Sequence, residues 1–244
     1  MRVLVGCEES QTITKAFREL GHEAFSCDLK PCSGGHPEWH LKGDFLDVVN
    51  HPENYMSVER EGIEWDMVIC HPPCTDLTVS GARHFEKKRA DGRQREAIEF
   101  FCKCLTLDVP KLCVENPVNI ISGDYIKEYF PDLCEKYGLP IKPTQIIQPY
   151  EYGNPSRKTT CLWLKGLPNL VPTNIVKPEL VTYTCKDGKK VTFSKDYALA
   201  SGDRGTVRSV TYSGVAKAMA EQWGNGIYPK PKRKGLLKSS SGDF

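Results

Sequence analysis

Short apolar runs that alternate with helix-like segments are the feature that most constrains the fold of this chain. Arg2–Gly6 and Glu23–Asp28 are rich in residues that favour β-strands, and the segment between them has apolar residues at helical spacing. Residues 66–70 and 112–115 repeat the pattern on either side of a predicted helix near 95–107. Strands that alternate with helices pair in parallel, so the sequence predicts an α/β fold with a doubly wound, mostly parallel sheet.

The second half of the chain adds elements of both kinds. Two β-prone runs flank Asp187 and Gly188, a dipeptide that favours a tight turn, and they predict a β-hairpin over residues 181–193. The other predicted elements are a first helix that Ser10 caps, helices near 125–137 and 213–223, and strands near 144–148 and 159–164.

Length and composition limit the kind of protein that this chain can form. The 244 residues, 39% of them hydrophobic, are enough for one full α/β core, and no apolar run reaches membrane-spanning length. No signal-peptide pattern precedes the first strand, so we expect a cytoplasmic protein. The 11 cysteines are scattered without a CxxC pair, which indicates buried thiols rather than disulfides or a metal site. Because the net charge is only +2, affinity for nucleic acid would need a local basic patch.

Residues capable of chemistry follow several predicted strands. Ligands of an open parallel sheet bind beyond the carboxyl ends of its strands. Cys74 follows a strand directly after two prolines, which restrict the backbone, and Glu115 ends a later strand. A cysteine attacks as a thiolate, and a glutamate in a partly desolvated pocket can act as a general acid. The residues at predicted strand ends are Glu8, Asp28, Asp44, Cys74 and Glu115.

Several of these residues also have simpler interpretations. Glu8 and Ser10 could cap the first helix, and Asp28 and Asp44 could be solvated loop carboxylates or helix caps. A single cysteine after a turn is usually structural. The combination of a cysteine and an acid at two strand ends is what favours a functional site.

A basic segment extends from Thr75 to Glu96. It is polar and contains glycines, so we expect a mobile loop that contacts nucleic-acid phosphates, with an ordinary solvated segment as the alternative. The cations expected at phosphates are Arg83, Lys87, Lys88, Arg89 and Arg93.

Taken in order, these residues resemble the DNA cytosine-5 methyltransferases, including the short proteins of this family that phages and prophages encode. Pro72-Pro73-Cys74 resembles the Pro-Cys nucleophile motif, and Glu115-Asn116-Pro117 resembles the Glu-Asn-Val motif. Arg157 is similar to an arginine of the Gln-x-Arg-x-Arg motif, and residues 213–216 resemble the last motif, which completes the cofactor pocket.

The resemblance implies a reaction and a set of site residues. Cys74 would attack carbon 6 of a cytosine that is flipped out of duplex DNA, or lies in single-stranded DNA, so that carbon 5 accepts a methyl group from S-adenosylmethionine. Glu115 would act on ring nitrogen 3, and Arg157 would complete the base pocket. The implied cofactor-binding residues are Gly6, Cys7, Glu8, Ser10, Asp28, Leu29, Asp44, Phe45 and Pro72.

The resemblance also implies a domain organisation. One Rossmann-like, S-adenosylmethionine-dependent methyltransferase domain would span residues 1–228, with a reduced target-recognition region at about 165–208 and a disordered basic tail at 229–244. The chain departs from the family in four places: the loop after the first strand has one glycine, Thr75 replaces a glutamine, the arginine motif is only partly kept, and the recognition region is short.

These departures keep alternatives open. The same fold could place another group on carbon 5 or use a free nucleotide as acceptor, and a non-catalytic nucleic-acid-binding module is a further hypothesis. Methylation of an amino group is disfavoured, because His71-Pro72-Pro73-Cys74 lacks both the Asp or Asn and the aromatic residue that such enzymes carry.

Overall fold

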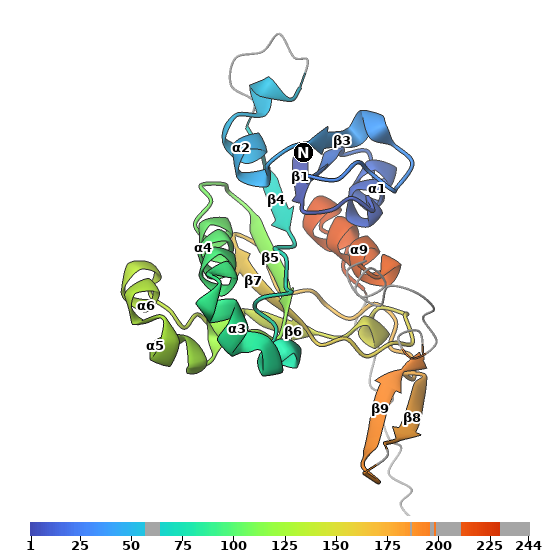
Figure 1. Cartoon of the computed structure of the whole chain (residues 1–244). Coiled ribbons are helices and arrows are strands. Elements are labelled where there is room, and N and C mark those ends of the chain that lie inside the picture. The colour runs from blue at the N-terminus through green and yellow to red at the C-terminus, as the bar shows by residue number, and fades with distance from the viewer. Residues whose placement is uncertain (57–63, 186, 196–197, 199–210, 230–244) are drawn as a thin grey trace, which may run out of the picture.

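A seven-stranded sheet forms the centre of the computed structural model, which describes residues 1–56, 64–185, 187–195, 198 and 211–229 (Figure 1). The strands are β1 (Arg2–Gly6), β2 (Glu23–Asp28), β3 (His40–Lys42), β4 (Met67–Cys70), β5 (Leu112–Pro117), β6 (Gln145–Ile147) and β7 (Thr160–Lys165). Their order is β3-β2-β1-β4-β5-β7-β6, and of these seven strands only β7 runs antiparallel to its neighbours. This is the doubly wound, mostly parallel α/β architecture that the sequence predicts.

Helices cover both faces of the sheet. The α-helices are α1 (Thr12–Glu19), α2 (Phe45–Asn50), α3 (Phe85–Ala90), α4 (Arg93–Leu105), α5 (Tyr125–Tyr129), α6 (Pro131–Tyr137) and α9 (Ser213–Met219), which continues into a π-helical turn, η6 (Ala220–Gly224). The 3-10 helices are η1 (Pro37–Trp39), η2 (Pro52–Asn54), η3 (Val79–His84), η4 (Ile120–Ser122) and η5 (Pro149–Glu151).

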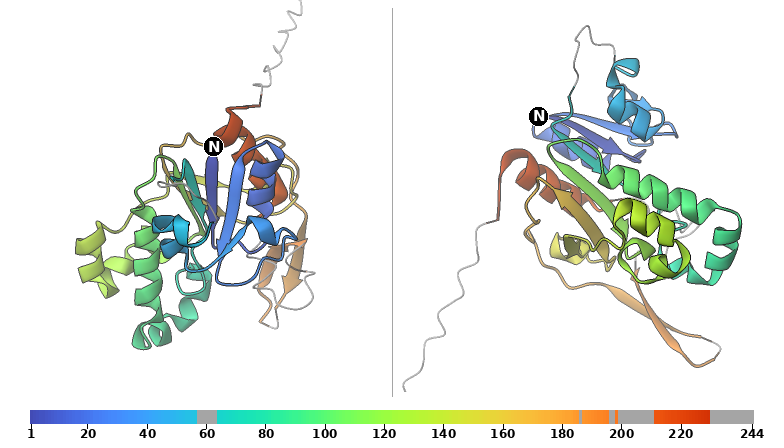
Figure 2. Two further views of the ribbon diagram at one scale, coloured as in Figure 1. Left: turned by 90° about the horizontal axis from the view of Figure 1, so that it is seen from above. Right: turned by 90° about the vertical axis from the view of Figure 1, so that its left-hand side faces the viewer.

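Two hydrophobic cores result from this layering. Because successive residues of a strand point to opposite faces, Val3 and Val5 of β1 pack with α1 and α9, whereas Leu4 packs with α2 and α4. Figure 2 shows α9 and α4 on opposite sides of the sheet. The sheet is therefore buried on both faces, which leaves its edges and strand ends as the places where a site can form.

A second, two-stranded sheet projects from the body of the protein (Figure 1). β8 (Leu180–Thr184) pairs antiparallel with β9 (Lys190–Ser194), which confirms the predicted hairpin. The register places Tyr183 opposite Val191, and the Tyr183 ring lies 6.4 Å from the ring of Phe193 between centroids. Apolar side chains therefore share one face of this hairpin.

The basic segment 75–96 differs from its prediction. We expected a mobile loop, but η3, α3 and the start of α4 run through it. Phe85 is 6% exposed, and its ring lies 4.9 Å from that of Tyr125 between centroids. Phe85 and the fully buried Leu77 thus hold a largely polar segment against the core. The helix expected over 125–137 is likewise divided into α5 and α6, at Pro131.

Some predictions concern residues outside the described ranges. They are the tail from residue 230 onward and, within the predicted recognition region, residues 186, 196–197 and 199–208. Among the helices of the described ranges, none combines the length and the apolar character that crossing a lipid bilayer requires.

Candidate active site

The carboxyl ends of β1, β4 and β5 lie side by side. Gly6 of β1 is in register with Cys70 of β4, and Cys70 is in register with Val114 of β5. The amide of His71 extends this pairing by donating to the carbonyl oxygen of Gly6 at 3.0 Å. The residues that follow these three positions therefore meet at one edge of the sheet, which we call the carboxyl edge. Ligands of such sheets bind at this edge.

The turn that carries Cys74 is hydrogen-bonded to the end of β5. Asn116 is 1% exposed, and its side-chain amide donates to the carbonyl oxygen of Pro72 at 2.7 Å. Asn119 donates in turn to the side-chain oxygen of Asn116 at 3.0 Å. Cys74 is half-buried, and its carbonyl oxygen accepts from the amide of Leu77 at 3.1 Å. Cys74 therefore lies on a well-held turn outside the two packed cores.

Glu115 is hydrogen-bonded to His71 across the carboxyl edge. Nδ1 of His71 lies 2.9 Å from Oε2 of Glu115, and the two side chains are 11% and 14% exposed, respectively. Burial tends to raise the pKa of Glu115, but the hydrogen bond from His71 and the charge of Lys158 leave this pKa below its usual value. Glu115 is therefore held as a carboxylate.

Lys158, next to the predicted base-pocket residue Arg157, is the cation whose charge acts on Glu115. Arg157 is exposed, and its backbone is joined to β9, since its N–H donates to Oγ of Ser194 at 2.7 Å and its carbonyl oxygen accepts from that hydroxyl at 3.0 Å. Lys158 is half-buried, and its charge acts on Glu115. Two adjacent cations in a sequence do not reveal which one faces a site, because neighbouring side chains leave the backbone in different directions.

Glu8 caps helix α1 from a buried position. It is 3% exposed, Oε1 accepts from the amide of Ile13 at 2.6 Å, and Oε2 accepts from the hydroxyl of Thr14 at 2.8 Å. Burial raises the pKa of Glu8, and the charge of His71 offsets part of that rise. Glu8 thus occupies the first amides of α1, which is the simpler of the two roles that the sequence left open.

Gln11, rather than the predicted Ser10, occupies the cap position of α1, with φ 57° in the left-handed region. Its fully buried side chain accepts from the amide of His36 at 3.0 Å and donates to the carbonyl oxygen of His36 at 2.7 Å. Gln11 therefore joins the segment after β2 to the start of α1. No pattern in the sequence signals this role, because glutamine is not among the preferred cap residues.

Two carboxylates lie near the carboxyl ends of β2 and β3. Asp28 ends β2, is half-buried, and accepts from the amide of Lys30 through Oδ1 at 2.9 Å. Asp44 is exposed and caps α2, with Oδ1 accepting from the amides of Leu46 and Asp47 at 2.9 and 3.1 Å. Within the described part of the chain, the Oδ2 atoms of both residues make no hydrogen bond. These oxygens are available to a hydroxyl or amino group of a ligand.

The other residues expected at a cofactor divide between the core and the surface. A Cβ at Gly6 would lie 2.1 Å from the ring of Phe45, which is 3% exposed, so these two residues pack against each other. Pro72 is buried, and Cys7 is half-buried with a left-handed φ of 57°. Leu29, directly after β2, is 71% exposed and offers an apolar surface beside that strand end.

Lys88 differs from its prediction as a phosphate contact. Its side chain is 8% exposed, and its ammonium group donates to the carbonyl oxygen of Thr75 and lies 3.2 Å from Oδ1 of Asp76. Gln94, which is fully buried, donates to the carbonyl oxygen of Asp76 at 3.1 Å. Lys88 and Gln94 therefore support the two residues that follow Cys74. The sequence could not reveal this, because the contact depends on how α3 packs against the turn.

The other four cations that were predicted at phosphates are engaged to different degrees. The guanidinium of Arg89 lies over a tyrosine ring, 3.9 Å from its centroid, and Arg93 pairs with Asp91 at 2.7 Å. Arg83 and Lys87 are exposed on η3 and α3. These last two are the cations of the segment best placed to meet a phosphate.

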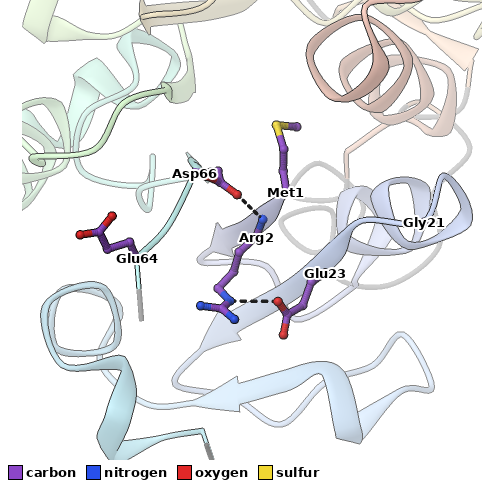
Figure 3. Close-up of a pocket in the computed structure, with 6 residues that line it drawn as sticks. All are labelled: Met1, Arg2, Gly21, Glu23, Glu64 and Asp66. Carbon is purple, nitrogen blue, oxygen red and sulfur yellow. Dashed lines mark hydrogen bonds and ion pairs between the residues drawn. The ribbon is translucent and has the colours of Figure 1, made fainter. Parts of the chain in front are cut away.

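A hollow of about 470 Å³ lies at the opposite edge of the sheet, where the strands begin (Figure 3). Its polar groups already pair with one another, since the amide of Arg2 donates to Asp66 at 2.6 Å and the side chain of Arg2 contacts Glu23 at 3.0 Å. It is therefore separate from the carboxyl edge. The residues that line it are Met1, Arg2, Gly21, Glu23, Glu64 and Asp66.

The chain matches no protein-family model, and no curated protein matches it in sequence. One similar solved structure is an E. coli protein encoded within a prophage and provisionally described as a DNA modification methyltransferase. It is 14% identical, with a TM-score of 0.46 over 72% of this chain and 52% of that one. Another is an Entamoeba histolytica methyltransferase, 11% identical, with a TM-score of 0.39 over 74% and 58% of the two chains. This chain thus spans little more than half the length of either, and the case for a function comes from its own residues.

Proposed function

We propose that this protein methylates carbon 5 of cytosine in DNA, with S-adenosylmethionine as the methyl donor and Cys74 as a covalent nucleophile. The observation that carries the proposal is the double link between two motifs. Asn116 binds the carbonyl oxygen of Pro72 at 2.7 Å, and Glu115 binds His71 at 2.9 Å. These bonds hold the turn of a cysteine and the end of a strand with an acid against each other at the carboxyl edge.

Cys74 supplies the thiolate that makes carbon 5 of the pyrimidine ring nucleophilic. Carbon 5 of cytosine is a weak nucleophile, but addition of a thiolate to carbon 6 converts the ring into an enamine whose carbon 5 attacks a methyl group. The transfer leaves the donor as the neutral thioether S-adenosylhomocysteine. The hydrogen on carbon 5 then passes to water as a proton and the thiolate is eliminated, so the cysteine is regenerated. Such a nucleophile must be reachable and held in place, and the half-buried Cys74 on its hydrogen-bonded turn meets both needs.

Glu115 is the proposed proton donor to ring nitrogen 3. When the thiolate adds, negative charge develops on the base, and a proton passed from the carboxyl group of Glu115 to nitrogen 3 neutralises it. When the thiolate leaves, nitrogen 3 returns the same proton to Glu115. Lys158 and His71 favour the carboxylate form of Glu115 while the site is open to water. The carboxylate takes a proton from water as the base enters, because the base excludes solvent and desolvation favours the neutral acid.

The residues beside β2 and β3 fit the nucleoside half of S-adenosylmethionine. Oδ2 of Asp28 can accept from ribose hydroxyls, Asp44 can accept from the adenine amino group, and the exposed Leu29 offers an apolar contact for the adenine ring. Glu8 already occupies the first amides of α1, so the methionine carboxylate of the cofactor binds at another position. When bound, the cofactor supplies an electrophilic methyl group.

DNA as the acceptor is supported by the exposed cations near the turn of Cys74. Arg83 and Lys87 lie on the helices that follow this turn, so phosphates bound there would bring a nucleotide close to the thiol. A cytosine in a duplex must leave the stack to reach a buried carboxylate such as Glu115.

Mass analysis of nucleosides after reaction of the protein with DNA and S-adenosylmethionine tests the proposal. We expect 5-methyldeoxycytidine with the wild type and a loss of roughly a thousandfold or more in Cys74→Ser. Cys185→Ser is the matched control, because Cys185 is an exposed free cysteine. DNA that contains 5-fluorocytosine should trap wild-type protein as a covalent adduct, since fluorine on carbon 5 cannot leave as a proton.

The other outcomes separate the remaining hypotheses. A different mass on the base would mean that another group is transferred, and modification of free deoxycytidine nucleotide without modification of DNA would mean a nucleotide acceptor. Binding of DNA with no detectable binding of S-adenosylmethionine by calorimetry would favour a non-catalytic module and would contradict the proposal.

A further inference from the structure

His71 directly follows β4 and is hydrogen-bonded to a carboxyl group of the neighbouring strand β5. Its Nδ1 is 2.9 Å from Oε2 of Glu115. The charge of His71 also offsets part of the rise that burial causes in the pKa of Glu8, which follows β1. The ring is almost fully enclosed, since its side chain is 11% exposed. His71 thus joins the end of β4 to Glu115 on β5 through its side chain.

The hydrogen bond from His71 leaves one side of Glu115 accessible. Oε2 is engaged by the imidazole, whereas Oε1 of Glu115 makes no hydrogen bond among the described residues. A carboxyl group held by one oxygen has a restricted rotation, so the other oxygen keeps a constant direction. For a general acid this direction decides whether the proton reaches its acceptor.

We infer that His71 is a positioning residue that orients the carboxyl group of Glu115 toward ring nitrogen 3 of the pyrimidine. This inference rests on the proposed function, because it assigns His71 a part in the cytosine chemistry. His71 does not itself contact the reacting atoms.

The buried ring atom of His71 supports a role beyond packing. Nε2 of His71 is buried and has no hydrogen-bond partner among the described residues. An unpaired buried polar atom costs stability, and a leucine of similar size would avoid that cost. A histidine at this position is therefore better explained by what its Nδ1 does for Glu115.

The charged groups around His71 and Glu115 determine the direction in which the pKa of Glu115 is shifted. Glu8 faces His71 from the end of β1, and Lys158 faces Glu115 from the segment before β7. Glu115 also acts on the thiols of Cys113 on β5 and Cys161 on β7, and burial raises the pKa of both. Both thiols are therefore neutral at physiological pH, and His71 and Lys158 are the groups that favour the carboxylate form of Glu115.

Without His71, two changes should occur together. The carboxylate would lose a hydrogen bond, so the pKa of Glu115 should rise toward that of a buried carboxyl group. It would also be attracted to the charge of Lys158 alone, which changes its direction. The first change is visible as a titration, and the second as a lower rate of the chemical step.

Three variants test the inference. His71→Leu removes the donor and keeps the bulk, His71→Asn retains an N–H near the position of Nδ1, and His71→Gln places its amide near Nε2. We expect His71→Leu to lower kcat by roughly 10- to 100-fold with little change in KM for DNA, which corresponds to one lost hydrogen bond to a charged group. His71→Asn should recover most of kcat, and His71→Gln should not.

The second readout does not depend on activity. Isotope-edited NMR of side-chain carboxyl groups, with Glu115→Gln to assign the signal, follows the titration of Glu115 directly. We expect a higher Glu115 pKa in His71→Leu and a value closer to the wild type in His71→Asn. An unchanged Glu115 titration in His71→Leu would overturn the inference, and so would equal kcat values for the Asn and Gln variants.

The two readouts also distinguish this inference from the proposed function. If wild-type protein forms no 5-methyldeoxycytidine, the proposed function fails, and an unmoved Glu115 titration would show that the link to His71 fails as well. If the wild type is active and His71→Leu keeps the full kcat, only the role of His71 is wrong. If His71→Leu does not fold, the difference in kcat between His71→Asn and His71→Gln tests the inference.

Discussion

The side-chain amide of Asn116 donates to the carbonyl oxygen of Pro72 at 2.7 Å, and this buried bond joins two motifs that are 44 residues apart in the sequence. It places the turn of Cys74 against the end of β5, directly beside Glu115. The relative position of Cys74 and Glu115, the proposed nucleophile and acid, therefore depends on this amide group together with the bond between His71 and Glu115.

Replacing Asn116 tests this dependence. Asn116→Ala leaves the Pro72 carbonyl oxygen without its donor, so we expect the free energy of unfolding to fall by about 1–3 kcal/mol. We also expect the single-turnover rate of 5-methyldeoxycytidine formation to fall by about tenfold or more, because small displacements of a nucleophile are costly. Asn154→Ala is the matched control, since Asn154 accepts from the amide of Gly214 at 3.0 Å, away from this turn. Equal losses of rate in the two variants would contradict the prediction.

Lys87 and Lys88 are adjacent, but replacing Lys88 should affect stability and replacing Lys87 should affect DNA binding. Lys88→Met removes a buried ammonium group from Asp76 and Thr75, so it should lower the free energy of unfolding by about 1–3 kcal/mol. Lys87→Ala should change stability by less than about 0.5 kcal/mol, because Lys87 is exposed. In DNA-binding titrations at several salt concentrations, Lys87→Ala should reduce the salt slope by about 1. Loss of salt dependence on replacing Lys88 instead would contradict the assignment.

Glu8 should make stability depend on pH in a defined direction. Burial raises the pKa of Glu8 above its unfolded value, so its contribution is fully present below the unfolded pKa and is lost as the pH rises through the folded pKa. Glu8→Gln cannot titrate. The free energy of unfolding of the wild type, measured by urea denaturation relative to this variant, should therefore be highest at acid pH and should decline as the pH rises. A difference that is constant with pH would rule this out.

The contribution of Glu115 to stability should depend on pH in the opposite direction, and the charge of Lys158 should be part of the reason. The pKa of Glu115 is lowered in the folded protein, so its contribution is present above the unfolded pKa and is lost as the pH falls through the folded pKa. Lys158→Met should raise the pKa of Glu115 and weaken this contribution, whereas Arg157→Met should leave the titration of Glu115 unchanged. Carboxyl NMR across the acid range measures both variants, and a larger shift in the Arg157 variant would reverse the assignment.

Local patterns in the sequence were sufficient for the architecture. Strand runs such as Arg2–Gly6, the turn signal at Asp187 and Gly188, and the order of strands and helices predicted the doubly wound sheet and the hairpin. These signals succeed because strand and turn preferences depend on neighbouring residues. The positions of Cys74 and Glu115 at strand ends followed from the same patterns, since parallel strands place their carboxyl ends at one edge.

Which side chains lie at the carboxyl edge and support it depends on tertiary packing alone. Nothing local marks Lys88 as buried, Lys158 rather than Arg157 as the cation near Glu115, or Gln11 as the cap of α1. Likewise, the partnership of His71 with Glu115 spans 44 residues. A sequence states which residues are charged or polar, but burial and hydrogen bonding depend on segments that meet only when the chain folds. For this reason the sequence alone predicted where the site lies, and the folded structure supplied the contacts within it.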